Sequence, residues 1–192
     1  MKEIILIGGG GHCKSVIDVI ELEGRFKITG IVEKSEIKKN TVEGYSVIGT
    51  DDDLKSLSRE YEFAFITVGQ IYSSNLRKQL FQRILNLGFK VPTIISPRAY
   101  ISKSSFADIG TVIMHDALIN ANTKIGMNCI INSKALIEHD CIVHNDCHIS
   151  TGATVNGGVI IERGSFIGSR AVTKESTIIK ENSFIKAGSV AK

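Results

Sequence analysis

The chain has 192 residues, of which 43% are hydrophobic and 22% are charged, and its formal net charge is +3. This composition is typical of a folded globular protein rather than of a disordered chain. So small a net charge, with scattered lysines and no tryptophan, disfavours a nucleic-acid-binding function. No apolar run approaches the roughly 20 residues of a membrane-spanning helix, so we expect neither a nucleic acid nor a membrane among the partners.

The N-terminal run MKEIILIGGGG is too short for a signal peptide and predicts a strand. Without an export signal we expect a cytoplasmic protein, in which the four cysteines stay reduced. Downstream, apolar runs alternate with helical patterns, which is typical of a small parallel α/β domain. The expected strands cover residues 3–8, 27–32 and 62–69, and the expected helices cover residues 12–24, 51–61 and 74–88. The helix signals are an N-cap at Asp51 or Asp52 and C-terminal glycines at Gly24 and Gly88.

A glycine-rich loop, ILIGGGGHCKSVID, follows the first expected strand and opens the first expected helix. Glycines let the backbone approach a phosphate closely, and a helix N-terminus favours negative charge. The loop does not fit a dinucleotide fingerprint, because Cys13 stands where the third glycine belongs. The domain is also about half of a full dinucleotide fold, so a nucleotide diphosphate sugar is a better ligand than NAD. A loop made only for a tight turn is the alternative.

The sequence changes character near Pro92 and Pro97, which predicts a first domain at 1–96 and a second at 97–192. From Ile101 to Ile185, thirteen of the fifteen positions taken at steps of six are Ile or Val. The residue four places after each of them is small in every repeat except at Val159. Residues two apart on a strand face the same way, so both kinds of position point inward. Three such sides would close a triangular coil, and stacked coils would form a parallel β-helix.

This pattern resembles the left-handed β-helix of hexapeptide-repeat acyltransferases. The stretch NSKALIEHDCIVHNDCHISTGATVNGGVIIERGSFIGS (132–169) is similar to bacterial sugar acetyltransferases of the sialic acid O-acetyltransferase type. The resemblance covers nearly the whole chain. It implies a small α/β Rossmann-like N-terminal domain followed by a C-terminal left-handed β-helix, with acetyl-coenzyme A as the acetyl donor. A structural β-helix or a carbonic anhydrase-like member of the superfamily is the alternative.

The register sorts the cluster IEHDCIVHNDCHIS, which is rich in histidine, cysteine and acid. Three cysteines, Cys129, Cys141 and Cys147, fall on the small inward positions and are expected in the core. They cannot share an outward-facing zinc ion with the histidines, so we expect no metal. A histidine-only metal site between subunits is the alternative, and His144 is expected to be a surface residue.

In the family that the chain resembles, a histidine followed by an acid is the base, and a second histidine nine residues later contacts acetyl-coenzyme A. The matching residues are His139, Asp140 and His148, with Glu138 as an alternative partner of the base. One coil side spans about six residues at ~3.3 Å each, so the two histidines should lie more than about 10 Å apart within one chain. They can cooperate only across subunits, and a homotrimer would create three equivalent sites.

The resemblance also carries over further binding residues. For coenzyme A they are Gly157 and Ser169. For the nucleotide sugar, the loop that ends Gly-His matches Gly10, Gly11 and His12, and the acidic pair of the second strand falls on Glu33 and Lys34. Gly69, at the end of the third expected strand, would line the same crevice.

These residues predict an acetyltransferase in which a neutral histidine takes a proton from the attacking sugar amine. No acyl-enzyme is needed, because the thioester of acetyl-coenzyme A is already activated. The predicted reaction is N-acetylation of a nucleotide-linked amino sugar, of the UDP-4-amino-sugar type, in surface glycan biosynthesis. The alternatives are O-acetylation of a sialic-acid-like sugar and a non-catalytic β-helix that binds a nucleotide sugar.

Overall fold

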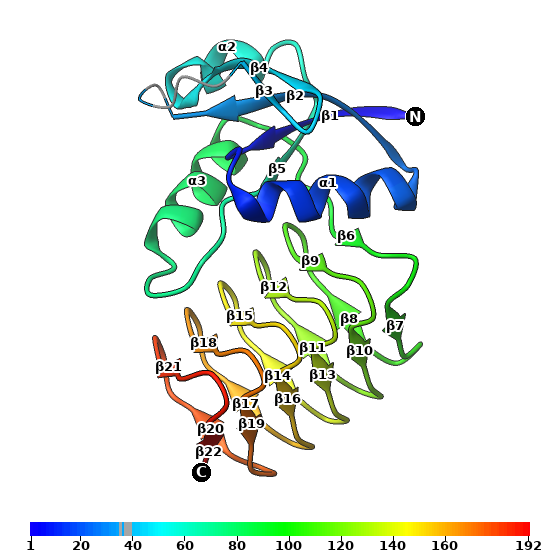
Figure 1. The fold of residues 1–192 in the computed structure, drawn as a ribbon, viewed down its shortest axis with the longest axis vertical. Helices are drawn as coiled ribbons and strands as arrows, with labels where there is room; N and C mark the ends of the chain where they lie inside the picture. Colours follow the sequence, from blue (N-terminus) through cyan, green and yellow to red (C-terminus); the bar gives the residue numbers. More distant parts are fainter. Residues whose placement is uncertain (35, 37–39) are drawn as a thin grey trace. The chain divides into compact units, whose positions relative to one another are not determined.

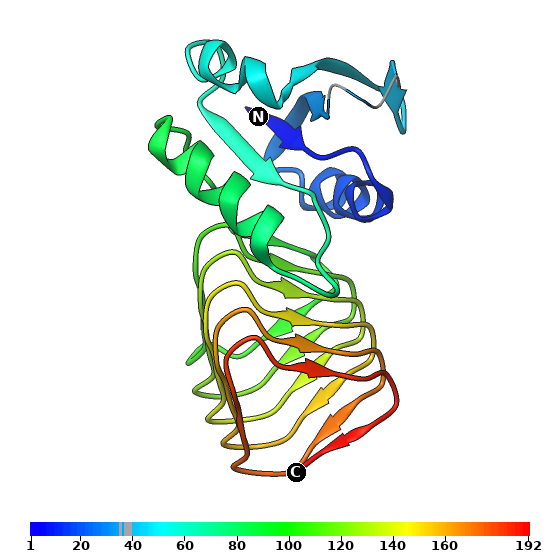
Figure 2. The same ribbon diagram turned by 90° about the vertical axis from the view of Figure 1, so that its left-hand side faces the viewer.

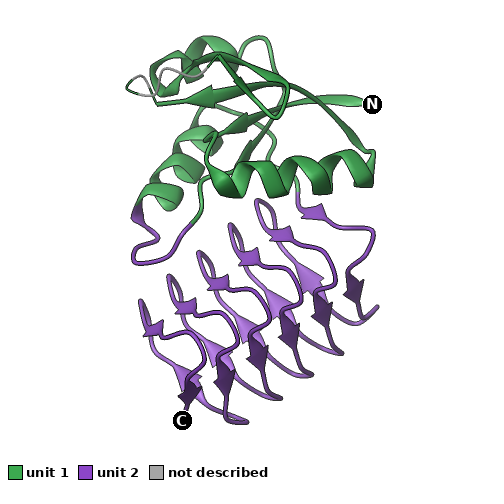
Figure 3. Ribbon diagram, in the orientation of Figure 1, with its two compact units in different colours: residues 1–69, 76–92 green, residues 70–75, 93–192 purple. Residues whose placement is uncertain are grey.

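The structure, a computed structural model, describes residues 1–34, 36 and 40–192 (Figure 1). The chain divides into two compact units, one of residues 1–69 and 76–92 and one of residues 70–75 and 93–192 (Figure 3). This division differs from the expected boundary between 96 and 97 in two places. Residues 93–96 belong to the second unit because their strand pairs with a strand of the β-helix. Segment 70–75 also belongs there, although it lies between two elements of the first unit.

The first unit contains a five-stranded sheet in the order β3-β4-β2-β1-β5, parallel except for the β3–β4 pair. Its strands are β1 (Lys2–Ile7), β2 (Phe26–Glu33), β3 (Thr41–Val42), β4 (Tyr45–Thr50) and β5 (Phe63–Ile66). Its helical elements are α1 (Gly11–Glu23), the 3₁₀ turn η1 (Asp51–Asp53), α2 (Leu54–Leu57) and α3 (Asn75–Asn86), whose first residue falls in the second unit. Strand β1 lies inside the sheet between β2 and β5, and its residues from Ile4 to Ile7 are buried in the core.

The three expected strands of this unit are confirmed, as are its first and third helices. Gly24 caps α1 in the left-handed conformation, as expected. The expected helix at 51–61 is shorter, since its α-helical part ends at Leu57. Its N-cap is Thr50 rather than an aspartate, because Asp53 Oδ2 accepts the Thr50 N–H at 2.8 Å and closes a capping box. The hairpin of β3 and β4 was not expected, because its strands are partly exposed and lack a continuous apolar run.

The second unit is a coil of two-residue strands that pair in parallel to form three faces (Figure 2). The β6 face contains β6 (Ile94–Ile95), β9 (Val112–Ile113), β12 (Ile130–Ile131), β15 (His148–Ile149), β18 (Phe166–Ile167) and β21 (Phe184–Ile185). The β7 face contains β7 (Tyr100–Ile101), β10 (Leu118–Ile119), β13 (Leu136–Ile137), β16 (Thr154–Val155), β19 (Val172–Thr173) and β22 (Val190–Ala191). The β8 face contains β8 (Phe106–Ala107), β11 (Lys124–Ile125), β14 (Ile142–Val143), β17 (Ile160–Ile161) and β20 (Ile178–Ile179).

The six-residue period is confirmed, and it extends one repeat beyond the predicted range at each end, to Ile95 and Ala191. Residues eighteen apart pair in neighbouring coils, as Ile119 and Ile137 do. The inward aliphatic and small residues form one core, which includes the three cysteines of the repeats. A residue with positive φ recurs every six positions from Gly110 to Gly188 and turns the chain at each corner. Glycine, asparagine and aspartate dominate these corners because they tolerate the left-handed conformation best.

Candidate active site

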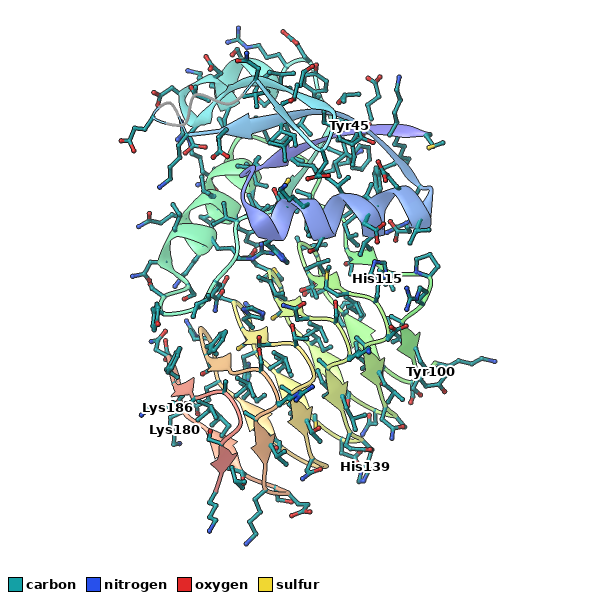
Figure 4. All side chains as sticks on the ribbon, viewed as in Figure 1. Tyr45, Tyr100, His115, His139, Lys180 and Lys186 are labelled. Carbon is teal, nitrogen blue, oxygen red and sulfur yellow. The ribbon has the colours of Figure 1, made fainter. Side chains whose placement is uncertain are left out.

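His139 and Asp140 occupy a corner of the coil, between β13 on the β7 face and β14 on the β8 face. Asp140 has a φ of 60° and is the left-handed residue of this turn. Figure 4 shows His139 at the edge of the coils, projecting away from them. The side chains of His139 and Asp140 are 61% and 55% exposed, so the pair is accessible to a substrate.

The two side chains form an oriented pair. His139 Nδ1 lies 2.8 Å from Asp140 Oδ2. A carboxylate only accepts hydrogen bonds, so the imidazole proton belongs on Nδ1 and the lone pair on Nε2. Hydrogen bonds from the Asn122 side chain and then from His139 hold the pKa of Asp140 below its usual value. Glu138, the alternative partner, instead accepts a hydrogen bond from Asn120 Nδ2 at 2.7 Å.

Gly157 lies beside the ring of His139, one coil further along the same corner. A Cβ atom built on Gly157 would be 2.9 Å from both Cε1 and Nε2 of His139. Real Cβ atoms do not approach other atoms this closely, so any larger residue would displace the imidazole. The glycine therefore makes room for the nitrogen that carries the lone pair, a role that the sequence alone did not reveal.

His148 lies on the β6 face, whereas His139 lies at the corner between the other two faces. Its side chain points away from the core but is only 7% exposed. His148 Nδ1 donates to the carbonyl of Gln70, and its Nε2 lies 3.1 Å from Asn132 Nδ2. Its ring also meets Phe166 edge-on at a centroid distance of 5.1 Å. Within one chain, His148 is thus a packed residue beneath segment 70–75, which sequence reasoning had assigned to the other domain.

Ser169 follows β18, at the corner between the β6 and β7 faces. Its hydroxyl lies 3.0 Å from that of Ser150. Of the three residues expected to contact coenzyme A, only Gly157 therefore shares a corner with His139. His144, expected at the surface, is exposed.

In the first unit, the glycine loop after β1 is tied to the end of β2. Gly8 has a φ of 102°, and a Cβ there would lie 2.5 Å from the Val68 side chain, so this position requires glycine. The carboxylate of Glu33 is buried and accepts the N–H of Gly9 at 2.9 Å and that of Lys34 at 3.0 Å. Glu33, expected to contact the substrate, thus has a clear role in shaping the loop.

The remaining residues expected to bind the nucleotide sugar gather around this loop. A Cβ on Gly10 or Gly11 would meet no atom within 4 Å, so their backbone faces open space. A Cβ on Gly69 would lie 3.5 Å from Cβ of His12, so the loops that follow β1 and β5 are neighbours. Since the chain crosses from β4 to β5 on the other side of β1, these loops flank the switch point of the sheet. Ligands of open α/β sheets bind at such a point.

Lys34 is one of the residues that line a pocket of about 330 Å³. The pocket is lined by Lys34, Glu36, Thr50, Asp51, Asp52 and Arg83. The sequence pointed to Lys34 alone among them. Thr50, Asp51 and Asp52 lie at or just after the end of β4, a strand that the sequence did not predict.

The described residues contain no group of three or more histidine, cysteine or acidic side chains placed to hold a metal ion. Cys129, Cys141 and Cys147 are fully buried, so they cannot contribute to a site on the outside of the coil. Among the residues that the structure describes, no helix is long and apolar enough to cross a membrane.

Comparison with known proteins agrees with this architecture. Residues 3–84 match the model of the PglD N-terminal domain, and residues 122–157 match that of the bacterial transferase hexapeptide (six repeats). The acetyltransferase domain of PglB from Neisseria gonorrhoeae, solved in complex with acetyl coenzyme A, is 32% identical, with a TM-score of 0.89. That match covers 97% of this chain and 89% of the other. A second structure of the same domain is also 32% identical, with a TM-score of 0.92, and the match covers 100% of this chain and 92% of the other.

A third similar structure is a histidine variant of perosamine N-acetyltransferase from Caulobacter crescentus, in complex with CoA and GDP-perosamine. It is 26% identical, with a TM-score of 0.72, and the match covers 99% of this chain and 93% of that one. The fold, an α/β domain followed by a left-handed β-helix of hexapeptide repeats, defines an acetyltransferase of the hexapeptide class. More narrowly, the chain belongs to the family of sugar acetyltransferases with a PglD-type N-terminal domain.

Proposed function

We propose that the protein transfers the acetyl group of acetyl-coenzyme A to the amino group of a nucleotide-linked amino sugar, as a step of surface glycan biosynthesis. The observation that carries this proposal is the His139–Asp140 pair, 2.8 Å apart, with Nε2 directed over Gly157. The acetyl-coenzyme A of the Neisseria structure and the GDP-perosamine of the Caulobacter structure support the two substrate classes.

In this mechanism the sugar amine attacks the thioester carbonyl carbon. A C–N bond forms, the C–S bond breaks, and Nε2 of His139 accepts the proton that the amine loses. Asp140 holds Nδ1–H and stabilises the imidazolium, as the acid of a catalytic triad does. The imidazolium then returns the proton to the departing coenzyme A thiolate. Only groups of the protein and its two substrates take part in these steps.

A homotrimer would complete the site, and the surface around His139 supports this assembly. Both faces that meet at its corner expose large apolar side chains. On the β7 face these are Tyr100, Leu118 and Val190, and on the β8 face they are Phe106, Ile142 and Ile178. Covering these side chains with a second copy of the chain would remove apolar surface from water, which favours association. In our proposal, a second chain brings its Ser169 towards the coenzyme that reaches His139 of the first chain, with Gly157 beneath it, while His148 stays packed beneath segment 70–75 of its own chain.

For the acceptor, the first unit supports binding of the nucleotide diphosphate. Gly10, Gly11 and His12 open α1, whose N-terminus has neither a side-chain cap nor an acidic residue in its first turn. A phosphate at this helix N-terminus would accept hydrogen bonds from backbone N–H groups, as at other helix N-termini. We assign Gly69 to the same crevice, and Glu33 and Lys34 to the side that holds the ribose or base.

The proposal is tested by measuring thiol release from acetyl-coenzyme A with UDP-, GDP- and CMP-linked sugars, each offered with an amino group and with a hydroxyl at the reacting carbon. We expect turnover with at least one amino sugar and a loss of about 10²–10⁴-fold in kcat for His139→Ala, the usual contribution of a general base. His144→Ala is the matched control, since His144 is an exposed histidine on the same coil. Turnover only with hydroxyl sugars would favour O-acetylation. No turnover with any sugar, or full activity of His139→Ala, would contradict the proposal.

A further inference from the structure

Asn122 lies one coil before Asp140, at the corner that carries His139. The two residues are eighteen positions apart and both adopt the left-handed conformation, with φ of 58° and 60°. Asn122 Nδ2 donates to Asp140 Oδ1 at 2.7 Å, and Asp140 Oδ2 lies 2.8 Å from His139 Nδ1. Each oxygen of the carboxylate therefore has its own partner, one from the preceding coil and one from the neighbouring residue.

Asn122 is itself held in place by a residue of the preceding coil. The backbone N–H of Asn122 donates to Ser104 Oγ at 3.0 Å, and Ser104 lies eighteen residues earlier, in the coil before that of Asn122. Ser104, Asn122 and Asp140 thus form a row of bonds along the corner that ends on the imidazole. A carboxylate on an exposed corner would otherwise rotate freely, and a rotating acceptor does not fix the tautomer of its histidine.

We propose that Asn122 is a positioning residue for the reaction: its amide fixes the Asp140 carboxylate so that Nδ1 of His139 keeps the proton and Nε2 keeps the lone pair. This inference rests on the proposed role of His139 as the base. Asn122 touches neither the imidazole nor the reacting atoms in the proposed mechanism, so it acts through Asp140. The low pKa of Asp140, whose largest cause is the Asn122 side chain, agrees with this arrangement.

The competing explanation is that Asn122 is present only because its turn needs a residue with positive φ. Asn182 provides a matched control, since it is an exposed asparagine at the same turn position of another corner, with φ of 57°. Glycine satisfies this backbone conformation at either position. Asn122→Gly therefore removes the amide and keeps the turn, and Asn182→Gly reports what the turn alone contributes.

The experiment measures the tautomer of His139 by ¹⁵N NMR of the histidine ring, together with kcat and KM for both substrates. We expect Asn122→Gly to lower the share of the Nδ1–H tautomer and to reduce kcat about threefold to tenfold, the range for losing one exposed charge-assisted hydrogen bond, with KM unchanged. Asn122→Asp should reduce kcat further, because it places a second carboxylate against Asp140. Asn182→Gly should leave the tautomer and kcat at the values of the unchanged protein.

An unchanged His139 tautomer in Asn122→Gly would overturn the inference, as would an equal change in Asn182→Gly. The NMR measurement needs no turnover. A shifted tautomer in a protein that acetylates no sugar would therefore contradict the proposed function and leave the role of Asn122 towards His139 supported.

Discussion

Replacing Gly157 with alanine should remove most of the activity and little of the stability. The added Cβ would lie 2.9 Å from Cε1 and Nε2 of His139. Carbon atoms pack best about 3.5–4.0 Å apart, so the ring must move by roughly 0.6–1.1 Å. Because the His139 side chain is 61% exposed, it can swing into solvent without disturbing the core. The displaced atom is the proposed base, and a misplacement of about 1 Å can cost on the order of 10²-fold in rate.

We therefore expect kcat of Gly157→Ala to fall about tenfold to a hundredfold in the thiol-release assay. The midpoint of urea unfolding should stay close to that of the unchanged protein. Thr151→Ala is the control, because Thr151 is exposed and occupies the same position of the repeat at a corner without His139. A Gly157→Ala protein with unchanged kcat would show that the space beside the imidazole has no part in the reaction.

Three further predictions concern stability, pH and thiol reactivity. Ile137→Ala removes a fully buried core side chain and should lower the free energy of unfolding by about 2–5 kcal/mol in urea titrations, whereas the partly exposed Leu118→Ala should cost less. Because the pKa of Asp140 is lowered from 3.8, its ionised form stabilises the fold above that pH, and this contribution disappears as pH falls through the lower folded value. The difference in unfolding midpoint between the unchanged protein and Asp140→Asn should accordingly shrink below about pH 4. A difference that grows there would contradict the assignment. Burial raises the pKa of Cys13 to about 11 and also raises that of Cys141, so neither thiol should react with a disulfide reagent at pH 8 until the protein is unfolded; rapid reaction in the native state would refute their burial.

The hairpin of β3 and β4 and the short α2 show where local patterns were insufficient. Thr41–Val42 and Tyr45–Thr50 carry few apolar residues, and β4 becomes a strand because β2 offers it a parallel edge. Such pairing depends on residues far apart in the chain, so propensity alone does not reveal it. The capping box at Thr50, in contrast, is a local signal in the sequence, because Thr50 is followed three residues later by Asp53, and it places the N-cap one residue before the expected Asp51.

The repeat of six residues, by contrast, was sufficient by itself to determine the β-helix. Each hexad buries one aliphatic and one small residue. Because this pattern repeats in every hexad, only one register of the strands buries all of these residues together. That register also placed Cys129, Cys141 and Cys147 inside and separated His139 from His148. The role of His139 as the base came from the resemblance to a family and remains a proposal.

Only the tertiary structure decided how the side chains at the active corner pair. Two acids flank His139 in the sequence, and Asp140 is the one that faces its Nδ1. The carboxylate of Glu138 instead accepts a hydrogen bond from Asn120. Asn122 lies eighteen residues before Asp140, and Gly157 lies eighteen residues after His139. Both contact the pair because each coil stacks on the preceding one. His148 is covered by segment 70–75, which is distant in sequence. Periodic burial specifies a repeated backbone, but contacts between coils depend on which polar groups the stacking brings within hydrogen-bonding distance.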